Sequence, residues 1–360
     1  MYKNNSNDFS DHDKVNFYKF CSKYPYQPMI LPKKDRIIVI GDIHGDYELA
    51  IDILKISKVI TLNGDNISWS GNNTVVVQIG DQIDRCRPYD KRCDHPDAII
   101  NDENSDIKIL KLFSDLHLQA VKHKGAVISL LGNHELMNVM GNMNYVSYKG
   151  LVEFENYVDP ENPDITFASG KDARKFSFSP GKEYAKLLAC TRIPAVIIGS
   201  WIFAHAGILP EFIDKVGIKK KNDLYKLNLD IRKWLLGLIN KDYISQIVDS
   251  FKYSMFWNRI LGNIPPNVDA SNQQCLEYIN PVLQTFQLKH MVIGHTPQFF
   301  SNNIGINKTC NDALWRVDTG SSSAFHYFDN KYTSNGIINQ FREAQALEIL
   351  NDSVINIIKL

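Results

Sequence analysis

The sequence has no excess of charge of either sign. Its 360 residues include 40 Lys and Arg and 40 Asp and Glu, so the formal net charge is zero. Proteins that bind nucleic acid or anionic membrane surfaces usually carry an excess of positive charge. We therefore expect neither a nucleic-acid partner nor a membrane partner.

Long apolar runs are also lacking. The N-terminal residues MYKNNSNDFSDHDK have no apolar segment of the kind that forms the core of a signal peptide. The most apolar stretch, residues 195–209, contains His205 and is too short to cross a bilayer. We expect a cytoplasmic protein.

None of the six cysteines forms a CxxC pair, which argues against a zinc ribbon or a thioredoxin-type site. In a reducing compartment free thiols are the expected state. Cys86 and Cys93 lie close together in a polar stretch, so a local disulfide between them stays open.

The order of apolar and helical segments predicts an α/β fold. Residues 1–30 read as a polar, partly disordered leader, and residues 31–360 as a single domain. Short β-branched runs at 36–40, 75–79 and 126–131 alternate with helical patterns at 46–58 and 106–124. This alternation is typical of a mostly parallel sheet that is buried on both faces, with ligands beyond the carboxyl ends of its strands.

The second half of the chain continues the pattern with longer insertions. Residues 193–208 read as a strand pair ending at His205, and residues 290–296 and 313–320 as two strand-to-loop transitions. Residues 346–360 read as a closing hairpin. We predict inserts at about 84–105, 141–180 and 211–256, of which 141–180 is a candidate cap over the site and 211–256 is helical.

Five segments share one layout, in which a strand ends at or near a Gly and polar residues follow. They are GDIHG (41–45), GDQIDR (80–85), GNHE (132–135), HAG (205–207) and GHT (294–296). One such segment alone is an ordinary turn. Five in series would place carboxylate, imidazole and amide groups in one crevice, a donor set that suits divalent Mn, Fe or Zn.

These segments resemble the motifs of the calcineurin-like metallophosphoesterases. The Asp84-Arg85 pair that ends GDQIDR is similar to the phosphoprotein phosphatase branch, and GNHELMNVMGNMNYV is most similar to its Shewanella-like, bacterial-type members. The resemblance spans residues 41–320. It implies a four-layer α/β/β/α sandwich with a helical or irregular cap insert.

The resemblance also implies two divalent metal ions, with Mn preferred and Fe or Zn as alternatives. Asp42 and His44 would bind the first ion, and Asp81 would bridge both. The second site would be completed by Asn133, His205 and His295. Two such ions can hold a bridging hydroxide that attacks phosphorus.

Further residues receive catalytic roles from the same resemblance. His134 would protonate the leaving oxygen, and Asp84 would orient it. Arg85 would hold phosphate oxygens, together with a second arginine for which Arg259 is preferred over Arg316. Asp318 would support a ligand, or simply cap a turn.

The sequence departs from the family pattern at Cys86, where a Gly is usual, and this puts the pose of Arg85 in question. The leading hypothesis is a phosphomonoesterase that acts on a phosphorylated protein or peptide, at Ser/Thr or Tyr, or on a small phosphoester. A dinucleoside-tetraphosphate hydrolase is the first alternative. A catalytically inactive phosphate- or partner-binding module is the alternative of another class, and the oligomeric state stays open.

Overall fold

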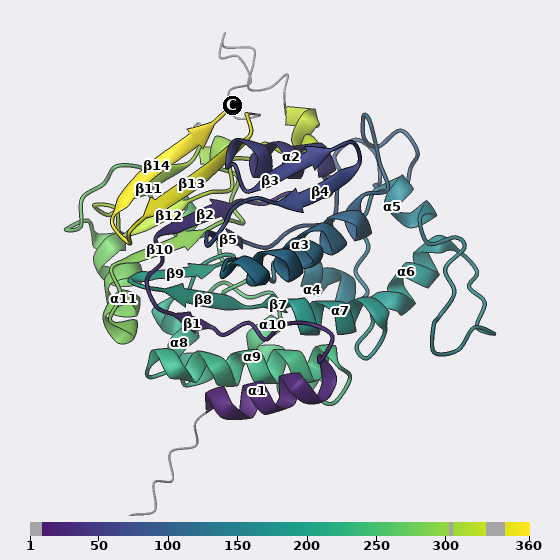
Figure 1. Ribbon diagram of the computed structural model, residues 1–360, viewed down its shortest axis with the longest axis horizontal. Coiled ribbons are helices and arrows are strands. Elements are labelled where there is room, and N and C mark those ends of the chain that lie inside the picture. The colour runs from purple at the N-terminus through teal and green to yellow at the C-terminus, as the bar shows by residue number, and fades with distance from the viewer. Residues whose placement is uncertain (1–8, 302–304, 329–342) are drawn as a thin grey trace, which may run out of the picture.

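The computed structural model describes residues 9–301, 305–328 and 343–360, and in this part of the chain two six-stranded sheets lie face to face (Figure 1). The first sheet has the order β14-β13-β2-β5-β6-β7, and the second has the order β1-β8-β9-β10-β12-β11. The strands are β1 (Ile30–Leu31), β2 (Arg36–Ile40), β3 (Ile60–Asn63), β4 (Asn66–Trp69), β5 (Val75–Gln78), β6 (Ala126–Leu130), β7 (Arg192–Ile193), β8 (Ala195–Ile198), β9 (Trp201–Ala204), β10 (His290–Ile293), β11 (Asn307–Thr309), β12 (Leu314–Arg316), β13 (Gln345–Leu350) and β14 (Val354–Lys359).

Helices cover the sheets and complete the predicted α/β/β/α sandwich. The α-helices are α1 (Phe9–Phe20), α2 (Tyr47–Ile56), α3 (Asp106–Ala120), α4 (Asn133–Val139), α5 (Tyr148–Val152), α6 (Gly170–Phe178), α7 (Glu183–Thr191), α8 (Pro210–Val216), α9 (Leu224–Leu235), α10 (Ser245–Val248) and α11 (Asn280–Phe286). Short 3₁₀ or π turns lie at η1 (Val121–His123), η2 (Lys221–Asp223), η3 (Lys241–Tyr243), η4 (Leu261–Asn263), η5 (Cys275–Ile279), η6 (Gln298–Ser301) and η7 (Ser323–Phe328).

The two faces of the first sheet belong to two apolar clusters. Ile38 and Ile40 of β2 pack with residues of α2 and α3, whereas Ile37 and Val39 face a larger cluster shared with the second sheet, α8, α9 and α11. Successive side chains of a strand point to opposite faces. Burial of both faces therefore explains why this strand is continuously apolar instead of alternating.

The predicted strands and helices are confirmed with small shifts of their ends. The β2–β5 and β5–β6 pairs are parallel, and α2 and α3 are the expected crossovers. The C-terminal hairpin turns at Asn351 and Asp352, which have φ values of 52° and 67°. Residues 84–105 contain no helix or strand, while 141–180 carry α5 and α6 and 211–256 carry α8, α9 and α10.

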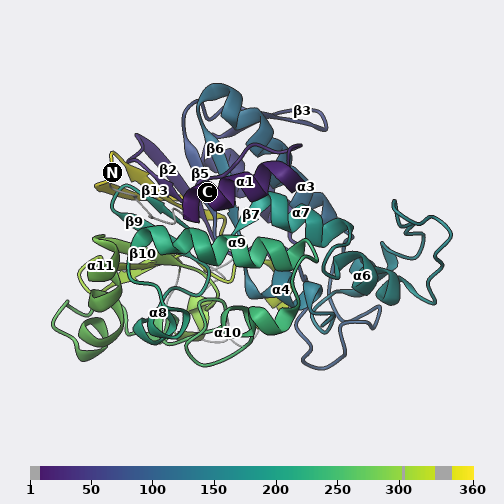
Figure 2. The same cartoon turned by 90° about the horizontal axis from the view of Figure 1, so that it is seen from below.

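Within the segment expected to be a partly disordered leader, residues 9–20 form α1; residues 1–8 lie outside the described residues. Helix α1 lies alongside α9 (Figure 2). The side chain of Asp13 is completely buried there and pairs with Arg232 of α9. A polar N-terminal sequence gave no sign of this docking, because its partner is more than 200 residues away.

All six cysteines are paired, so the expectation of free thiols is wrong. The disulfides join Cys21 to Cys190, Cys86 to Cys93 and Cys275 to Cys310. The Cys86–Cys93 disulfide, which the sequence analysis considered, is therefore present. The other two disulfides join cysteines whose spacing in the sequence gives no sign of pairing. Disulfides persist in oxidising surroundings, so these three weigh against the expected cytoplasmic location. Among the described residues, no helix combines the length and the apolar character that crossing a membrane requires.

Candidate functional site

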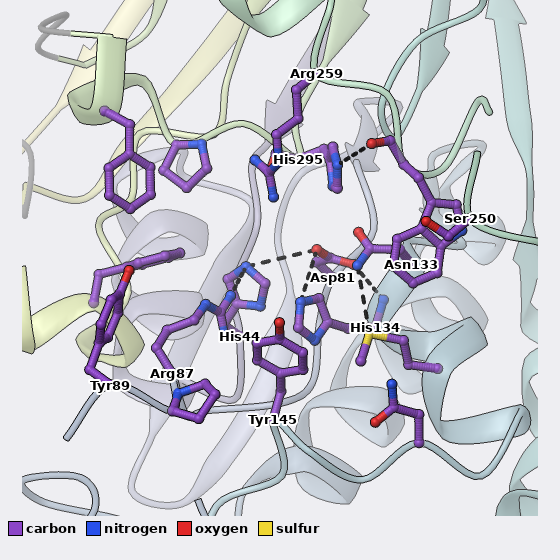
Figure 3. Close-up of a pocket in the computed structure, with 17 residues that line it drawn as sticks. His44, Asp81, Arg87, Tyr89, Asn133, His134, Tyr145, Ser250, Arg259 and His295 are labelled. Carbon is purple, nitrogen blue, oxygen red and sulfur yellow. Dashed lines mark hydrogen bonds and ion pairs between the residues drawn. The ribbon is translucent and has the colours of Figure 1, made fainter. Parts of the chain in front are cut away.

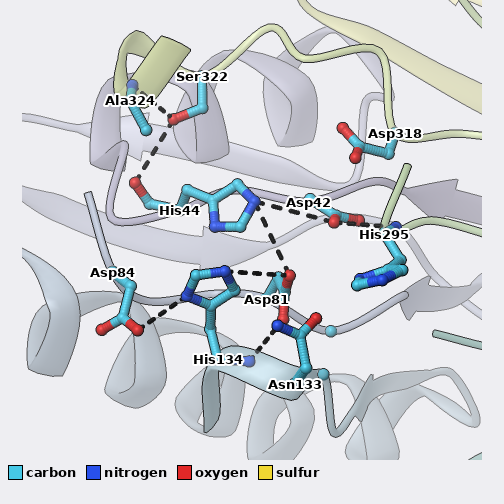
Figure 4. A network of polar contacts seen from close by, with 12 residues as sticks. Asp42, His44, Asp81, Asp84, Asn133, His134, His295, Asp318, Ser322 and Ala324 are labelled. Carbon is cyan, nitrogen blue, oxygen red and sulfur yellow. Dashed lines mark hydrogen bonds and ion pairs between the residues drawn. The ribbon is translucent and has the colours of Figure 1, made fainter. Parts of the chain in front are cut away.

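The predicted site residues meet at the carboxyl ends of strands from both sheets (Figure 4). Parallel neighbours end at the same edge, and the chain turns into a polar loop after each. Asp42 and His44 follow β2, Asp81 and Asp84 follow β5, Asn133 and His134 follow β6, His205 follows β9, His295 follows β10, and Asp318 follows β12.

Tight backbone turns bring these side chains together. His44, Asp81, Asp84 and His295 have φ values of 47°, 52°, 74° and 66°, in the left-handed region that non-glycine residues rarely adopt. A Cβ on Gly132 would lie 2.2 Å from the Asp81 carboxylate. The motif glycine is therefore needed for close approach.

Asp81 lies at the centre of the cluster. Its Oδ2 is 3.3 Å from His205 Nε2, 3.8 Å from His44 Nε2 and 3.9 Å from His134 Nε2. Its Oδ1 accepts a hydrogen bond of 2.9 Å from the His134 backbone N–H. One carboxylate thus faces ligand atoms on both sides, as the predicted bridging role requires.

The remaining predicted ligands flank this carboxylate. Asp42 Oδ2 lies 3.9 Å from His44 Nε2 and accepts from the backbone N–H of His295. On the other side, Asn133 Oδ1 lies 2.9 Å from His205 Nε2. His44, Asp81 and His134 offer ligand atoms within 4.8 Å of one another, and so do Asp81, His205 and His295.

The hydrogen bonds of the histidines test whether divalent cations fit. His205 donates through Nδ1 to the carbonyl of Ile79, and its Nε2 faces the oxygens of Asn133 and Asp81 at 2.9 and 3.3 Å. Burial lowers the pKa of His205, but the Asp81 carboxylate outweighs burial and raises it, so a proton on Nε2 can stand where a metal cation would bind between the three atoms. Carbonyl bonds to the far ring nitrogen are typical of metal-binding histidines.

Two further buried atoms in the cluster have no hydrogen-bond partner. His295 donates through Nε2 to the carbonyl of Trp257, and its Nδ1 is unpartnered. Asp42 Oδ1 is also buried and unpartnered. Leaving such acceptors unsatisfied costs about 1–3 kcal/mol each. The unpartnered acceptors of Asp42 and His295 therefore fit a divalent cation on each side of Asp81, whereas His44 Nε2 would have to exchange its contact with Arg87 Nη2 for the metal.

The electrostatics of the cluster point the same way. Burial, reinforced by Asp318 and Asp81, raises the pKa of Asp42 well above its usual value. Burial lowers the pKa values of His44 and His295, which keeps both imidazoles neutral. A bound cation would stabilise the charged form of the Asp42 carboxylate, which burial disfavours. It would also bind the neutral imidazoles of His44 and His295.

His134 is turned toward a carboxylate as predicted. Its Nδ1 lies 2.8 Å from Asp84 Oδ2, and both side chains are buried. An imidazole that donates to a carboxylate through Nδ1 keeps Nε2 available at the pocket. Proximity to Asp81 alone would also allow a ligand role, so the Asp84 contact is the feature that separates His134 from the other histidines.

Arg85 does not line the pocket. Its guanidinium donates to the carbonyl of Gly45 at 2.9 Å and pairs with Glu103 at 2.8 Å. Ser323, the carbonyl of Asn101 and the carboxylate of Asp46, at 3.6 Å, also lie beside this guanidinium. The predicted phosphate-holding arginine therefore ties loop segments together behind the site.

Arg87 occupies the pocket wall instead. Its Nη2 lies 2.8 Å from His44 Nε2, and its guanidinium lies over the rings of Tyr145 and Phe325. The sequence analysis missed Arg87, because it falls outside the family motif. The Cys86–Cys93 disulfide, which closes the loop that carries Arg87, was the available signal.

Of the two candidates for a second arginine, Arg259 lines the pocket, whereas Arg316 is buried against Asn307 and backbone carbonyls. Figure 3 shows the guanidinium groups of Arg87 and Arg259 turned toward the centre of the pocket. The cavity has a volume of about 690 Å³. Its walls include Tyr89, Tyr145, Trp257, Phe300 and Phe325, all of them missed by the sequence analysis.

Comparison with known proteins decides the family. Residues 35–299 match the family described as calcineurin-like phosphoesterase. The chain belongs to the calcineurin-like phosphoesterases. It is a metallophosphoesterase related to the phosphoprotein phosphatases, which are hydrolases of phosphoric monoesters.

Relatives of this phosphoesterase include an uncharacterized protein, R398, of Acanthamoeba polyphaga mimivirus, which is 40% identical over 68% of the chain and 97% of the relative. Shewanella-like protein phosphatase 2 of Arabidopsis thaliana is 27% identical over 91% of the chain and 78% of its own length. The crystal structure of a cold-active protein-tyrosine phosphatase from a psychrophilic Shewanella has a TM-score of 0.59 at 19% identity, covering 92% of this chain and 82% of that one. At 19% identity, the similarity to the Shewanella structure shows a shared fold only.

Two acidic residues support the phosphoesterase motifs from behind. The Glu135 carboxylate is completely buried and accepts from the backbone N–H groups of Asp81, Gln82 and Gly132. Asp318 Oδ1 accepts from the Gly320 N–H, its Oδ2 is buried without a partner, and burial raises its pKa to about 6. Asp318 therefore caps a turn through Oδ1, which is one of the two roles expected for it. Its Oδ2 is available for the other role, the support of a metal ligand.

Proposed function

We propose that this phosphoesterase is a protein phosphatase that uses two divalent metal ions. The observation that carries the proposal is the set of buried acceptor atoms without partners around Asp81, placed beside the His134–Asp84 pair in one cavity. A binding module would have no need of a hydrogen-bonded acid next to that cluster. The arrangement therefore favours catalysis over binding alone.

Asp42, His44 and Asp81 would hold one ion, and Asp81, Asn133, His205 and His295 the other. Bound in this way, the ions supply a hydroxide near neutral pH and charge neutralisation for the phosphoryl group. Mn is our preferred metal, with Fe or Zn as alternatives, because the donors are mixed oxygen and nitrogen without thiolate.

His134 would give a proton from Nε2 to the leaving oxygen of the substrate. Asp84 fixes the imidazole so that Nδ1 carries the internal hydrogen bond and Nε2 faces the pocket. Such a positioned acid matters most when the leaving group is a poor one. This division of roles assigns His134 to chemistry and Asp84 to orientation.

Arg87 and Arg259 would hold the phosphoryl oxygens from two sides of the cavity. A guanidinium matches phosphate geometry and stabilises the charge that builds up in the transition state. The aromatic planes of Tyr145 and Phe325 restrict Arg87 to its place. In this proposal Arg85 contributes to the stability of the loop and not to phosphate binding.

We propose phosphorylated protein as the substrate, with phosphotyrosine preferred. Aromatic side chains line the cavity beside the two arginines, and these surfaces favour stacking against an aryl group. The Shewanella protein of similar fold carries the name of a protein-tyrosine phosphatase. A small phosphoester or a dinucleotide remains an outcome of the test below.

The deciding experiment is hydrolysis of p-nitrophenyl phosphate with Mn²⁺, without added metal and after chelation. Asp81→Asn is compared with Asp65→Asn, which changes an exposed aspartate outside the cluster. We expect metal-dependent turnover that Asp81→Asn abolishes and Asp65→Asn retains. Absence of turnover in the wild type with every divalent metal would refute the proposal.

Substrate class is then measured with phosphotyrosine and phosphoserine peptides of otherwise identical sequence, beside diadenosine tetraphosphate. A higher kcat/KM for the phosphotyrosine peptide is the expected result. Preferred cleavage of diadenosine tetraphosphate would replace the protein-phosphatase reading by the dinucleotide one.

A further inference from the structure

The guanidinium of Arg174 lies directly behind the pair formed by His134 and Asp84. Arg174 belongs to α6, in the region predicted to cap the site, yet its side chain is 0% exposed. It donates to the carbonyl of Gly150 and lies over the rings of Phe154 and Phe178. Burial of a charged guanidinium costs free energy unless each of its N–H donors has a hydrogen-bond partner.

Arg174 determines how Asn138 is oriented. Its Nε donates to Asn138 Oδ1 at 2.9 Å. Because a guanidinium has donors and no acceptor, the amide oxygen of Asn138 must face it. The amide nitrogen is then directed the other way, where it donates to Asp84 Oδ1 at 2.9 Å and to the carbonyl of His134 at 3.0 Å.

Asp84 is consequently held at both carboxylate oxygens. Oδ1 accepts from Asn138 and Oδ2 contacts His134, so the plane of the carboxylate is determined by two partners. Arg174 Nη2 also lies 3.6 Å from Oδ1, within ion-pair distance. Without Asn138 the carboxylate could rotate, and the imidazole would lose its orienting partner.

Asp106 connects the same arginine to the backbone of Asp84. Its Oδ2 accepts from Arg174 Nη2 at 2.7 Å, and its Oδ1 accepts from the Asp84 N–H at 3.2 Å. The backbone of Asp84 has a φ of 74°, an unfavourable conformation for a non-glycine residue. Arg174 thus acts on the side chain of Asp84 through Asn138 and on its backbone through Asp106.

We propose that Arg174 and Asn138 are positioning residues for proton donation by His134. The proposal rests on the proposed phosphatase function. It gives α6, in the 141–180 region predicted to cap the site, a supporting role behind the catalytic pair. Neither residue would touch the substrate. Their contribution would consist of keeping the Asp84 carboxylate in the plane that the imidazole requires.

The test compares two substrates that differ in their need for an acid. Phenyl phosphate has a poor leaving group, and 2,4-dinitrophenyl phosphate has one that departs without protonation. Loss of a positioned acid lowers rates by roughly 10²–10⁴-fold, and the loss applies mainly to the poor leaving group. The variants are Asn138→Leu and Arg174→Lys, with His134→Asn as the reference for complete loss of the acid.

Arg232→Lys serves as the matched control, because Arg232 is also buried and paired with a carboxylate but contacts α1 instead of the site. We expect Asn138→Leu to lower kcat for phenyl phosphate about tenfold or more and to change kcat for 2,4-dinitrophenyl phosphate less than about threefold. Arg174→Lys should give a smaller difference of the same sign, and Arg232→Lys none. Tm and circular dichroism establish that each variant is folded.

The outcomes separate the two proposals. If His134→Asn shows the substrate-dependent loss but Asn138→Leu and Arg174→Lys lower both rates equally, the positioning role is overturned and phosphatase function stands. If the wild type hydrolyses neither substrate with any divalent metal, both proposals fail. If only Arg174→Lys is unfolded, Asn138→Leu decides.

Discussion

At the scale of single residues, backbone strain and its compensation are concentrated at the site. Four of the predicted site residues have positive φ, which costs of order 1–3 kcal/mol for each. Glu135 offsets part of this cost, because its carboxylate accepts from three backbone N–H groups around Asp81. A residue that does not line the pocket therefore holds the Asp81 carboxylate in place.

We predict that Glu135→Gln weakens metal binding. The amide nitrogen of Gln would face N–H donors, so at least one hydrogen bond is lost, and changes behind metal ligands typically lower affinity about 10–100-fold. Metal content after dialysis against graded chelator measures the effect. Glu48→Gln, at an exposed site on α2, is the control, and equal metal retention by both variants would contradict the prediction.

A second residue-scale prediction concerns acid stability. His117 is 5% exposed, its Nδ1 accepts from the Val127 N–H, and burial lowers its pKa to about 4. In the unfolded chain a histidine has a pKa of about 6.5. Between these values the unfolded chain binds one more proton, so His117 makes stability fall as the pH drops through this range.

His117→Asn keeps an acceptor near Val127 and removes the titration. We expect the fall in Tm between about pH 7.5 and about pH 5 to be smaller in this variant than in the wild type. His123→Asn, at an exposed position six residues along, should behave as the wild type. Equal pH dependence of His117→Asn and the wild type would show that His117 does not contribute.

At the scale of elements, the loop of residues 84–105 carries two arginines with different surroundings. Arg85 is buried between Gly45, Glu103 and Ser323, whereas Arg87 faces His44 in the pocket. The Cys86–Cys93 disulfide closes the loop at the point where the family usually has Gly. Its turns, and not the spacing of the motif, decide which arginine reaches the cavity.

We predict opposite outcomes for substitution of the two arginines. Arg87→Met removes a pocket cation and should lower kcat/KM for p-nitrophenyl phosphate about 10²–10³-fold with little change in Tm. Arg85→Met removes the donors to the carbonyls of Gly45 and Asn101 and the ion pair with Glu103, and should mainly lower Tm. If Arg85→Met instead abolishes turnover at unchanged Tm while Arg87→Met is active, Arg85 must turn into the pocket when phosphate binds.

At the scale of the whole molecule, the N-terminal segment is joined to the body of the protein twice. Helix α1 packs on α9 through Phe17 and the buried Asp13–Arg232 pair, and Cys21 bonds to Cys190 at the end of α7. The disulfide spans a sequence separation of 169 residues. A link over so long a segment restricts the unfolded chain strongly.

We predict that the double variant Cys21→Ser/Cys190→Ser is less stable by about 4 kcal/mol and exchanges the amide hydrogens of α1 faster. Phosphatase turnover should persist, because these cysteines are not among the residues that form the site. Thiol counting by mass spectrometry, followed by Tm and hydrogen exchange, tests this. Six alkylated thiols in the native wild-type protein would contradict the pairing itself.

Local signals explain why much of the fold and site could be read in advance. The β-branched runs at β2, β5 and β6, each ending before a Gly, defined buried strands because both faces of that sheet are covered. The predicted ligands from Asp42 to His295 follow strands directly, so strand direction alone brought them to one edge. The motif also led to the His134–Asp84 contact, which the structure contains.

Other features depend on side chains that meet only in three dimensions. The sequence by itself determined the alternation of elements, the edge at which polar residues collect and their chemical type, because these follow from periodicity and from what comes next along the chain. Only the tertiary structure decided that Arg87 and not Arg85 faces the cavity, that α1 docks on α9, and that Asn138 and Arg174 hold Asp84. These contacts join segments tens to hundreds of residues apart, and their geometry depends on loop turns and side-chain packing that no local pattern specifies.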